Sequence, residues 1–207
     1  MYWTIKFKIY RFLKSVPAVL LLLFVCACGS DKSAPAQNKP CNKASGMPLV
    51  KITENDTVAG LDIFIDDQHF TTYLFTDSLK KPVLFPVYSP AGKQVTRGFP
   101  VMPRPGERVD HPHHLGIWFN YGNVNGLDFW NNSYLVQEEK QANFGKIAHQ
   151  SVETAASGDT GLLVVTTKWL AADGTALLHE RTSFYISATG SRYFVDRSTT
   201  LQALADS

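Results

Sequence analysis

Residues 110–118 read DHPHHLGIW, which places one acid, three histidines and a tryptophan within nine positions. Half of the six histidines of the chain lie in this segment. An imidazole, whose unperturbed pKa is about 6.5, can transfer protons at neutral pH, and its neutral form is the commonest metal-binding side chain. The segment is therefore the first candidate for chemistry.

Local geometry decides which of these side chains could work together. Pro112 disfavours helical geometry at the residue before it and so favours an extended segment. Side chains alternate along an extended chain. We therefore expect His111 and His113 to point to one side and His114 to the other.

Three interpretations of the histidines remain open. His111 and His113 could act as acid and base at a sugar, with Asp110 as orienter and His149 as a third catalytic member. His111 and His113 could instead ligate a metal ion, with His149 or a carboxylate as the third ligand, although no helical HExxH pair supports a metal. The histidines could also hold the loop in place by bonding backbone carbonyls. The prediction taken forward is acid–base chemistry, with no cofactor.

Polar and aromatic residues around the histidines fit a carbohydrate ligand. Indole rings suit the apolar faces of a sugar, and Arg104, Asn125 and Asp128 can hydrogen-bond its hydroxyls. Trp118 and Trp130 could supply the indoles, or they could belong to the hydrophobic core.

The elements that must position these residues are predicted to be strands. Runs rich in β-branched and aromatic residues recur from residue 49 onwards, and Gly/Asp turns separate them. This pattern indicates an all-β antiparallel sandwich, in which short loops join the last four strands as a meander. The eight predicted strands are residues 49–53, 61–66, 69–75, 83–89, 145–154, 161–171, 176–187 and 192–204.

The histidines lie in a long segment, residues 86–132, that is rich in proline and glycine and cannot be one regular element. Long irregular segments inside compact domains are usually functional or disordered. Because this one carries five aromatic residues between positions 118 and 130, we expect it to pack across a sheet and form one wall of a pocket.

The start of the chain is typical of an exported lipoprotein. Four basic residues precede an apolar run of about a dozen residues, which is shorter than the roughly 20 that a membrane span needs. Ala27 precedes Cys28, with Val25 three positions before the cysteine, so Cys28 is the predicted lipidation site. We therefore expect a signal peptide over residues 1–27 and acyl chains that anchor the protein to the cell-envelope membrane.

Residues 28–48 read as a flexible tether, and residues 49–207 form the predicted domain. Cys41 lies in the tether and no cysteine follows it, so the domain has no disulfide. Removal of residues 1–27 takes away four positive charges and no negative one, and the formal charge changes from +2 to −2. We expect no nucleic-acid partner, because the basic character belongs to the leader.

Residues 105–133, PGERVDHPHHLGIWFNYGNVNGLDFWNNS, resemble the family labelled "methane oxygenase PmoA-like". The match extends to about residues 80–204. It implies a site composed of Glu107, Asp110, His111, His113, His114, Trp118, Asn125, Asp128, Trp130 and His149. Many members have Arg where this chain has Leu115, and His-Gly-Asp where it has residues 121–123, which weakens a metal site.

The label does not fit a chain whose one long apolar run is an export signal, since a methane monooxygenase membrane subunit needs several spans. The family's β pattern is similar to the galactose-mutarotase-like supersandwich, whose histidines act on sugars. Members continue beyond residue 204, so we expect a sandwich incomplete at its C-terminus, with residues 192–201 as a strand lacking one neighbour. The function expected is an envelope lipoprotein that binds a carbohydrate and isomerises or cleaves it. A non-catalytic carbohydrate-binding lipoprotein and a histidine-ligated metalloenzyme are the alternatives.

Overall fold

The structure is a computed structural model that describes residues 2–8, 46 and 48–204. Most of the predicted tether, including Cys28 and Cys41, lies outside the described residues. The strands are β1 (Tyr2–Lys8), β2 (Val50–Glu54), β3 (Gly60–Ile65), β4 (Gln68–Leu74), β5 (Val83–Val87), β6 (Lys146–Ala156), β7 (Thr160–Leu170), β8 (Ala176–Thr189) and β9 (Arg192–Ala203). A short 3-10 helix, η1 (Glu138–Asn143), precedes β6 and was not predicted. Each of the eight predicted strands is present.

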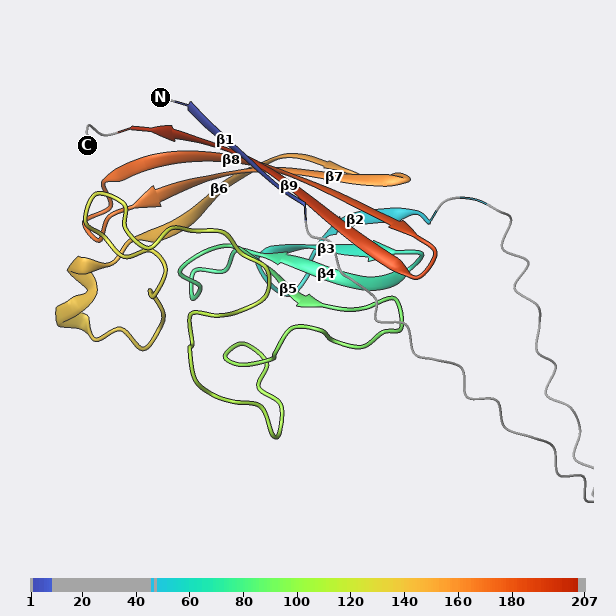
Figure 1. The fold of residues 1–207 in the computed structure, drawn as a ribbon, viewed down its shortest axis with the longest axis horizontal. Coiled ribbons are helices and arrows are strands. Elements are labelled where there is room, and N and C mark those ends of the chain that lie inside the picture. The colour runs from blue at the N-terminus through green and yellow to red at the C-terminus, as the bar shows by residue number, and fades with distance from the viewer. Residues whose placement is uncertain (1, 9–45, 47, 205–207) are drawn as a thin grey trace, which may run out of the picture. The chain divides into compact units, whose positions relative to one another are not determined.

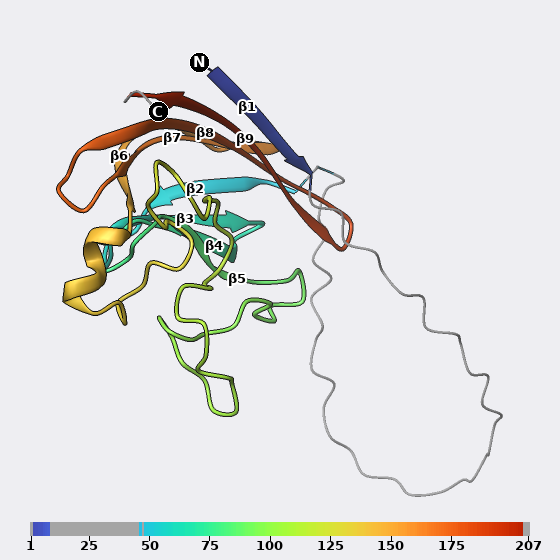
Figure 2. The same ribbon diagram turned by 60° about the vertical axis from the view of Figure 1, so that its left-hand side comes forward.

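Two antiparallel sheets form a sandwich, as predicted (Figures 1 and 2). One sheet has the order β1-β9-β8-β7-β6, and the other has the order β2-β3-β4-β5. The last four strands form the expected meander, since each pairs with the next along the chain. The described residues contain no helix that is both apolar enough and long enough to span a bilayer.

Alternating side chains from both sheets fill the space between the layers. Ile63 and Ile65 of β3 face Leu163 and Val165 of β7 across one buried cluster, as period-two burial predicts. At Gly161 an added Cβ would lie 2.4 Å from a methyl carbon of Val50. Glycine at this position lets the backbones of β2 and β7 lie close together.

The prediction for the C-terminal strand is wrong. β9 pairs with β8 on one side and with β1 on the other, where Tyr2 lies opposite Gln202 and Lys8 opposite Asp196. Residues 2–8 were assigned to a leader outside the fold, and the structure places them in a strand. This pairing could not be predicted from the sequence, because it joins segments almost 200 residues apart in the chain.

The irregular segment between β5 and η1 packs against the sandwich, as predicted. Ile117 exchanges backbone hydrogen bonds with Leu84 of β5, at 2.9 and 3.0 Å. Leu115 and Phe129 are buried beneath the loops. Ile117 and Phe119 also line a small hollow of about 20 Å³, but His111, His113 and His114 of the same segment do not.

Candidate functional site

The three neighbouring histidines lie in a turn. The amide of His114 donates to the carbonyl of His111 at 2.9 Å, and His111 has a φ of 49°. The turn brings all three rings together: the His111 and His114 rings stack with centroids 5.1 Å apart, and His113 meets the edge of His114 at 4.3 Å. The expected alternation, with His114 on the opposite side, is therefore wrong, because the segment is not extended.

Asp110 lies beside His111, as predicted for an orienting carboxylate. Its Oδ2 is 3.2 Å from Nδ1 of His111 and 2.7 Å from Arg108, and its Oδ1 accepts a hydrogen bond from Arg97 at 3.0 Å. Burial raises the pKa of Asp110, but the Arg108 charge and the hydrogen bonds from His111 and Arg97 hold it below its ordinary value. The carboxylate is therefore ionised at neutral pH and can fix the orientation of the His111 ring.

Two indoles and a buried lysine complete the cluster. Trp118 and Trp130 meet edge to face with centroids 4.7 Å apart, and His114 lies 6.1 and 6.0 Å from them. The Lys81 ammonium lies 4.2 Å from the Trp118 ring centroid and donates to the Trp130 carbonyl at 2.9 Å. Burial lowers the pKa of Lys81 to about 8, while Asp128 opposes the shift. We call His111, His113, His114, Trp118, Trp130 and Lys81 the histidine cluster.

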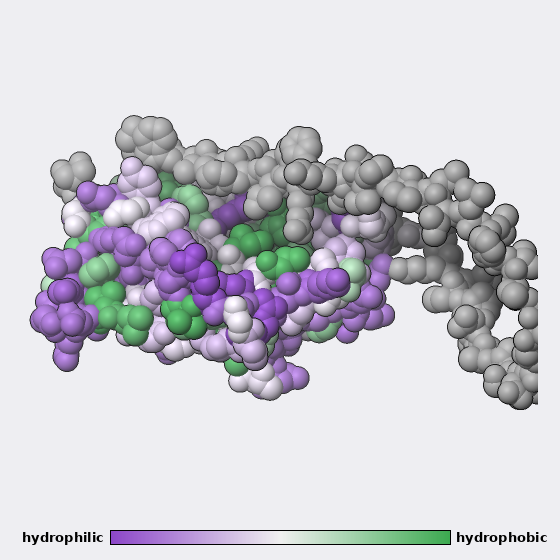
Figure 3. Space-filling model, turned by 60° about the horizontal axis from the view of Figure 1, so that its bottom comes forward, coloured by the Kyte–Doolittle hydropathy of each residue, from purple (hydrophilic) through white to green (hydrophobic). Residues whose placement is uncertain are grey.

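The cluster is partly accessible to ligands. Figure 3 views the side of the molecule that carries the irregular segment, where hydrophobic patches lie among hydrophilic residues. Trp130 lies at the surface of the cluster, where it is 41% exposed. Lys81, in contrast, is 4% exposed and lies beneath the indoles. Sequence pattern alone could not single out this lysine, because Lys80 precedes it directly and nothing in the pattern separates the two.

The environment keeps His113 neutral. Burial, followed by the charges of His114, Lys81 and His111, lowers its pKa to about 4, although Asp128 opposes the shift. Burial and the neighbouring cations also lower the pKa of His114. At pH 7 the His113 ring is therefore uncharged and has one nitrogen able to accept a proton.

We expect replacement of Lys81 with methionine to raise the pKa of His113. The lysine charge disfavours the imidazolium, so its removal eases protonation. An Asp128→Asn variant should shift the pKa in the opposite direction, because that carboxylate favours the imidazolium. NMR titration of the imidazole protons measures both shifts, and an unchanged His113 pKa in both variants would contradict this electrostatic account.

Arg104 and Glu107 bind each other at the base of the loop. The Glu107 carboxylate accepts hydrogen bonds from the amides of Gly98 and Phe99 and from Arg104 Nε at 2.8 Å. The hydrogen bond from Arg104 is the largest influence, and the pKa of Glu107 is lowered despite partial desolvation. Arg104 and Glu107 were both predicted to contact the ligand. In this structure they instead form hydrogen bonds within the loop.

Asn125 and Asp128 occupy the turn that precedes Trp130. Asn125 has a φ of 50° and lies in the two-residue turn between Val124 and Leu127. The Asp128 carboxylate accepts hydrogen bonds from the amides of Trp130 and Asn131 at 2.8 and 3.0 Å. Asp128 thus holds Trp130 in place and puts a negative charge near Lys81 and His113, whereas Asn125 is exposed on the turn.

His149 belongs to a different part of the molecule. Its ring stacks on Phe75 with centroids 3.9 Å apart, and its Nδ1 lies 3.3 Å from the Tyr73 hydroxyl. The structure thus does not bring His149 together with His111 and His113 as a third catalytic member or metal ligand. Among the described residues, no three His, Cys, Asp or Glu side chains are placed to hold a metal ion.

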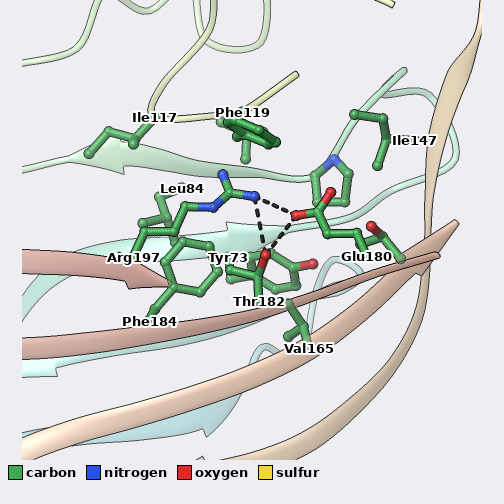
Figure 4. Close-up of a pocket in the computed structure, with 13 residues that line it drawn as sticks. Tyr73, Leu84, Ile117, Phe119, Ile147, Val165, Glu180, Thr182, Phe184 and Arg197 are labelled. Carbon is green, nitrogen blue, oxygen red and sulfur yellow. Dashed lines mark hydrogen bonds and ion pairs between the residues drawn. The ribbon is translucent and has the colours of Figure 1, made fainter. Parts of the chain in front are cut away.

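A buried ion pair that sequence reasoning missed lies between the sheets (Figure 4). Arg197 of β9 donates to Glu180 of β8 at 2.5 Å, and Glu180 also accepts from Trp169 Nε1 at 2.7 Å and from Thr182 at 2.6 Å. Glu180 is 2% exposed, so its carboxylate lies in the protein interior. Strand alternation places Arg181 on the outer face, where it pairs with Glu153.

Two hollows among the described residues help to define possible sites. The first, of about 20 Å³, lies beside the Glu180–Arg197 pair and is about the size of one water molecule. The second, of about 290 Å³, is lined by His149, Phe75 and Lys81. The three clustered histidines line neither hollow, so a ligand of the histidine cluster would bind at the surface beside Trp130.

Comparison with known proteins gives a family and no function. A family model described as "Family of unknown function (DUF6807)" matches residues 60–207, which is about 70% of the chain and includes the whole histidine cluster. No curated protein and no solved structure matches the chain. The chain belongs to this family of unknown function, DUF6807.

Proposed function

We propose that the protein is an envelope lipoprotein that binds a sugar or glycoside at the histidine cluster. The observation that carries the proposal is the convergence of three imidazoles with two indoles beside an oriented carboxylate. The exposed Trp130 offers an apolar face to a sugar ring, and the imidazoles offer donors and acceptors to its hydroxyls. The predicted resemblance to PmoA-like proteins agrees with such a site.

Acid–base chemistry on the bound sugar is the reaction that this cluster supports best. Asp110 can accept the Nδ1–H of His111, which leaves Nε2 directed away from the carboxylate and able to exchange a proton with a ligand. The neutral His113 ring can accept a proton from a hydroxyl. Isomerisation or cleavage of a glycoside requires one group that removes a proton and another that supplies one. The pair His111 and His113 can fill these two roles.

NMR titration of the full chain with a panel of sugars and oxidised glycosides tests the binding proposal. A ligand should shift the side-chain resonances of His113, Trp118 and Trp130, and a His113→Ala variant should weaken its binding. The matched control is His179→Ala, which removes an imidazole from β8 outside the cluster. If no compound in the panel shifts these resonances, the carbohydrate proposal fails.

A non-catalytic binding protein is a second candidate, favoured by the exposure of His111. Its side chain is 57% exposed, so bulk water competes for any proton it transfers. Product analysis with the sugar that binds best separates the two functions. Turnover that is lost in His111→Ala while binding persists supports an enzyme, and binding without turnover in the unmodified protein supports the second candidate.

The proposed anchor is a diacylated Cys28, with residues 1–27 removed as the signal peptide. The anchor would hold the site at a membrane surface of the cell envelope. Mass spectrometry of the mature N-terminus is the direct measurement. An unmodified Cys28 in protein recovered from membranes would contradict the proposal.

A further inference from the structure

The larger hollow forms a pocket separate from the three clustered histidines. It lies where the loop between β4 and β5 meets the start of β6. Its volume is about 290 Å³, near the lower end of the range for small-molecule sites. Its lining residues come from three segments, namely Ala59, residues 75–77, 79, 81 and 82, and residues 146–149.

The buried Tyr73 determines which ring nitrogen of His149 carries the proton. Burial, and then the charge of Glu180, raise the pKa of the Tyr73 hydroxyl well above its usual range, so the hydroxyl keeps its proton. The hydroxyl lies 3.3 Å from His149 Nδ1 and can donate to it. Burial lowers the pKa of His149, so its ring is neutral at pH 7. With Nδ1 as the acceptor, the ring proton must lie on Nε2.

His149 therefore offers a hydrogen-bond donor, and the rest of the lining adds positive charge. Lys146 and Lys81 line the pocket together with a single carboxylate, Asp77, which lies 4.0 Å from the Lys146 ammonium. Asp77 is fully exposed, so water screens its charge. Phe75, stacked on His149, supplies an apolar wall.

We propose that this pocket is a second binding site, which takes a carboxylate-bearing molecule of monosaccharide size. Lys146 pairs with the carboxylate, and His149 Nε2–H donates to an oxygen of the ligand. The ring or carbon chain of the ligand lies against Phe75. None of the three clustered histidines lines this pocket, so the site is distinct from the proposed carbohydrate site, although Lys81 borders both.

The test uses D-glucuronate as the probe and D-glucose as its uncharged counterpart, in calorimetric titrations of the full chain. We expect glucuronate to bind at least about tenfold more tightly than glucose, because a charge-assisted hydrogen bond contributes about that factor. Lys146→Gln and His149→Gln should each weaken glucuronate binding by about tenfold. The control Lys140→Gln, which removes a charge from η1 outside the pocket, should leave the affinity unchanged.

Side-chain nitrogen NMR gives a readout that does not depend on affinity. The His149 spectrum should show the proton on Nε2, and Tyr73→Phe should mix the two tautomers; the unmodified protein alone tests this point if that variant does not fold. Equal binding of the two probes, affinity unaffected by Lys146→Gln and His149→Gln, or a proton on Nδ1 would overturn the proposal. Shifts confined to residues 111–118 would overturn it and leave the carbohydrate proposal standing.

Discussion

Replacement of Glu180 with alanine is expected to lower the free energy of unfolding by about 3–5 kcal/mol, because it leaves the Arg197 guanidinium buried without its counter-charge. The carboxylate is 2% exposed and accepts hydrogen bonds from Arg197, Trp169 and Thr182. Thr182 and Trp169 would each lose an acceptor, and an unpaired buried donor adds to the cost. Urea denaturation monitored by tryptophan fluorescence measures the change.

Two control variants separate the effect of burial on stability from the effect of removing a charge. Arg181→Ala removes a cation from the next position of β8, where its partner Glu153 is on the surface, and should change stability by no more than about 1 kcal/mol. A double variant, Glu180→Leu with Arg197→Met, should recover much of the stability lost in Glu180→Ala, because no unpaired charge remains. A single Glu180→Ala variant as stable as the unmodified protein would show that the pair is not buried.

A Gly116→Ala substitution is expected to cost about 2–4 kcal/mol and to disturb the histidine cluster. Gly116 has a φ of 56°, and an added Cβ would lie 2.2 Å from the carbonyl oxygen of Leu84. The neighbouring residue, Ile117, exchanges two backbone hydrogen bonds with Leu84. The loop must therefore move away from β5, which displaces the histidines just before it and Trp118 just after it.

Gly122→Ala is the matched control, because an added Cβ at this loop glycine has no atom within 4 Å and its φ lies outside the left-handed range. Thermal unfolding and the histidine NMR spectrum together test the expectation. Gly122→Ala should leave both unchanged. A Gly116→Ala protein with unaltered histidine resonances would contradict the dependence of the cluster on this contact.

The fold could be predicted because each strand carries its own local signal. The run 161–171 is rich in β-branched and other apolar residues and is followed by the turn residues 172–175, and the run 176–187 is followed by the turn residues 188–191. Short loops between such runs leave few ways to pair them other than a meander. The pairing of β1 with β9 could not be predicted in this way, because no local pattern specifies a partner at the other end of the chain.

The site could be predicted in its residue types but not in its geometry. The cluster of histidines and aromatics was visible as composition, and Asp110 was expected beside His111. The turn at His111–His114 was missed because Pro112 was expected to hold His111, the residue before it, in an extended segment. Lys81 and the Glu180–Arg197 pair were missed because burial of a charge depends on strand register and on residues distant in sequence.

The contact between β1 and β9 bears on maturation. If signal processing before Cys28 occurs as proposed, the precursor has five strands in its larger sheet and the mature protein has four, because the cut removes Tyr2–Lys8. The amides and carbonyls of β9 that face β1 then lose their partners, and an open strand edge readily adds a strand from another chain. Cleavage would thus move the open edge of this sheet from β1 to β9.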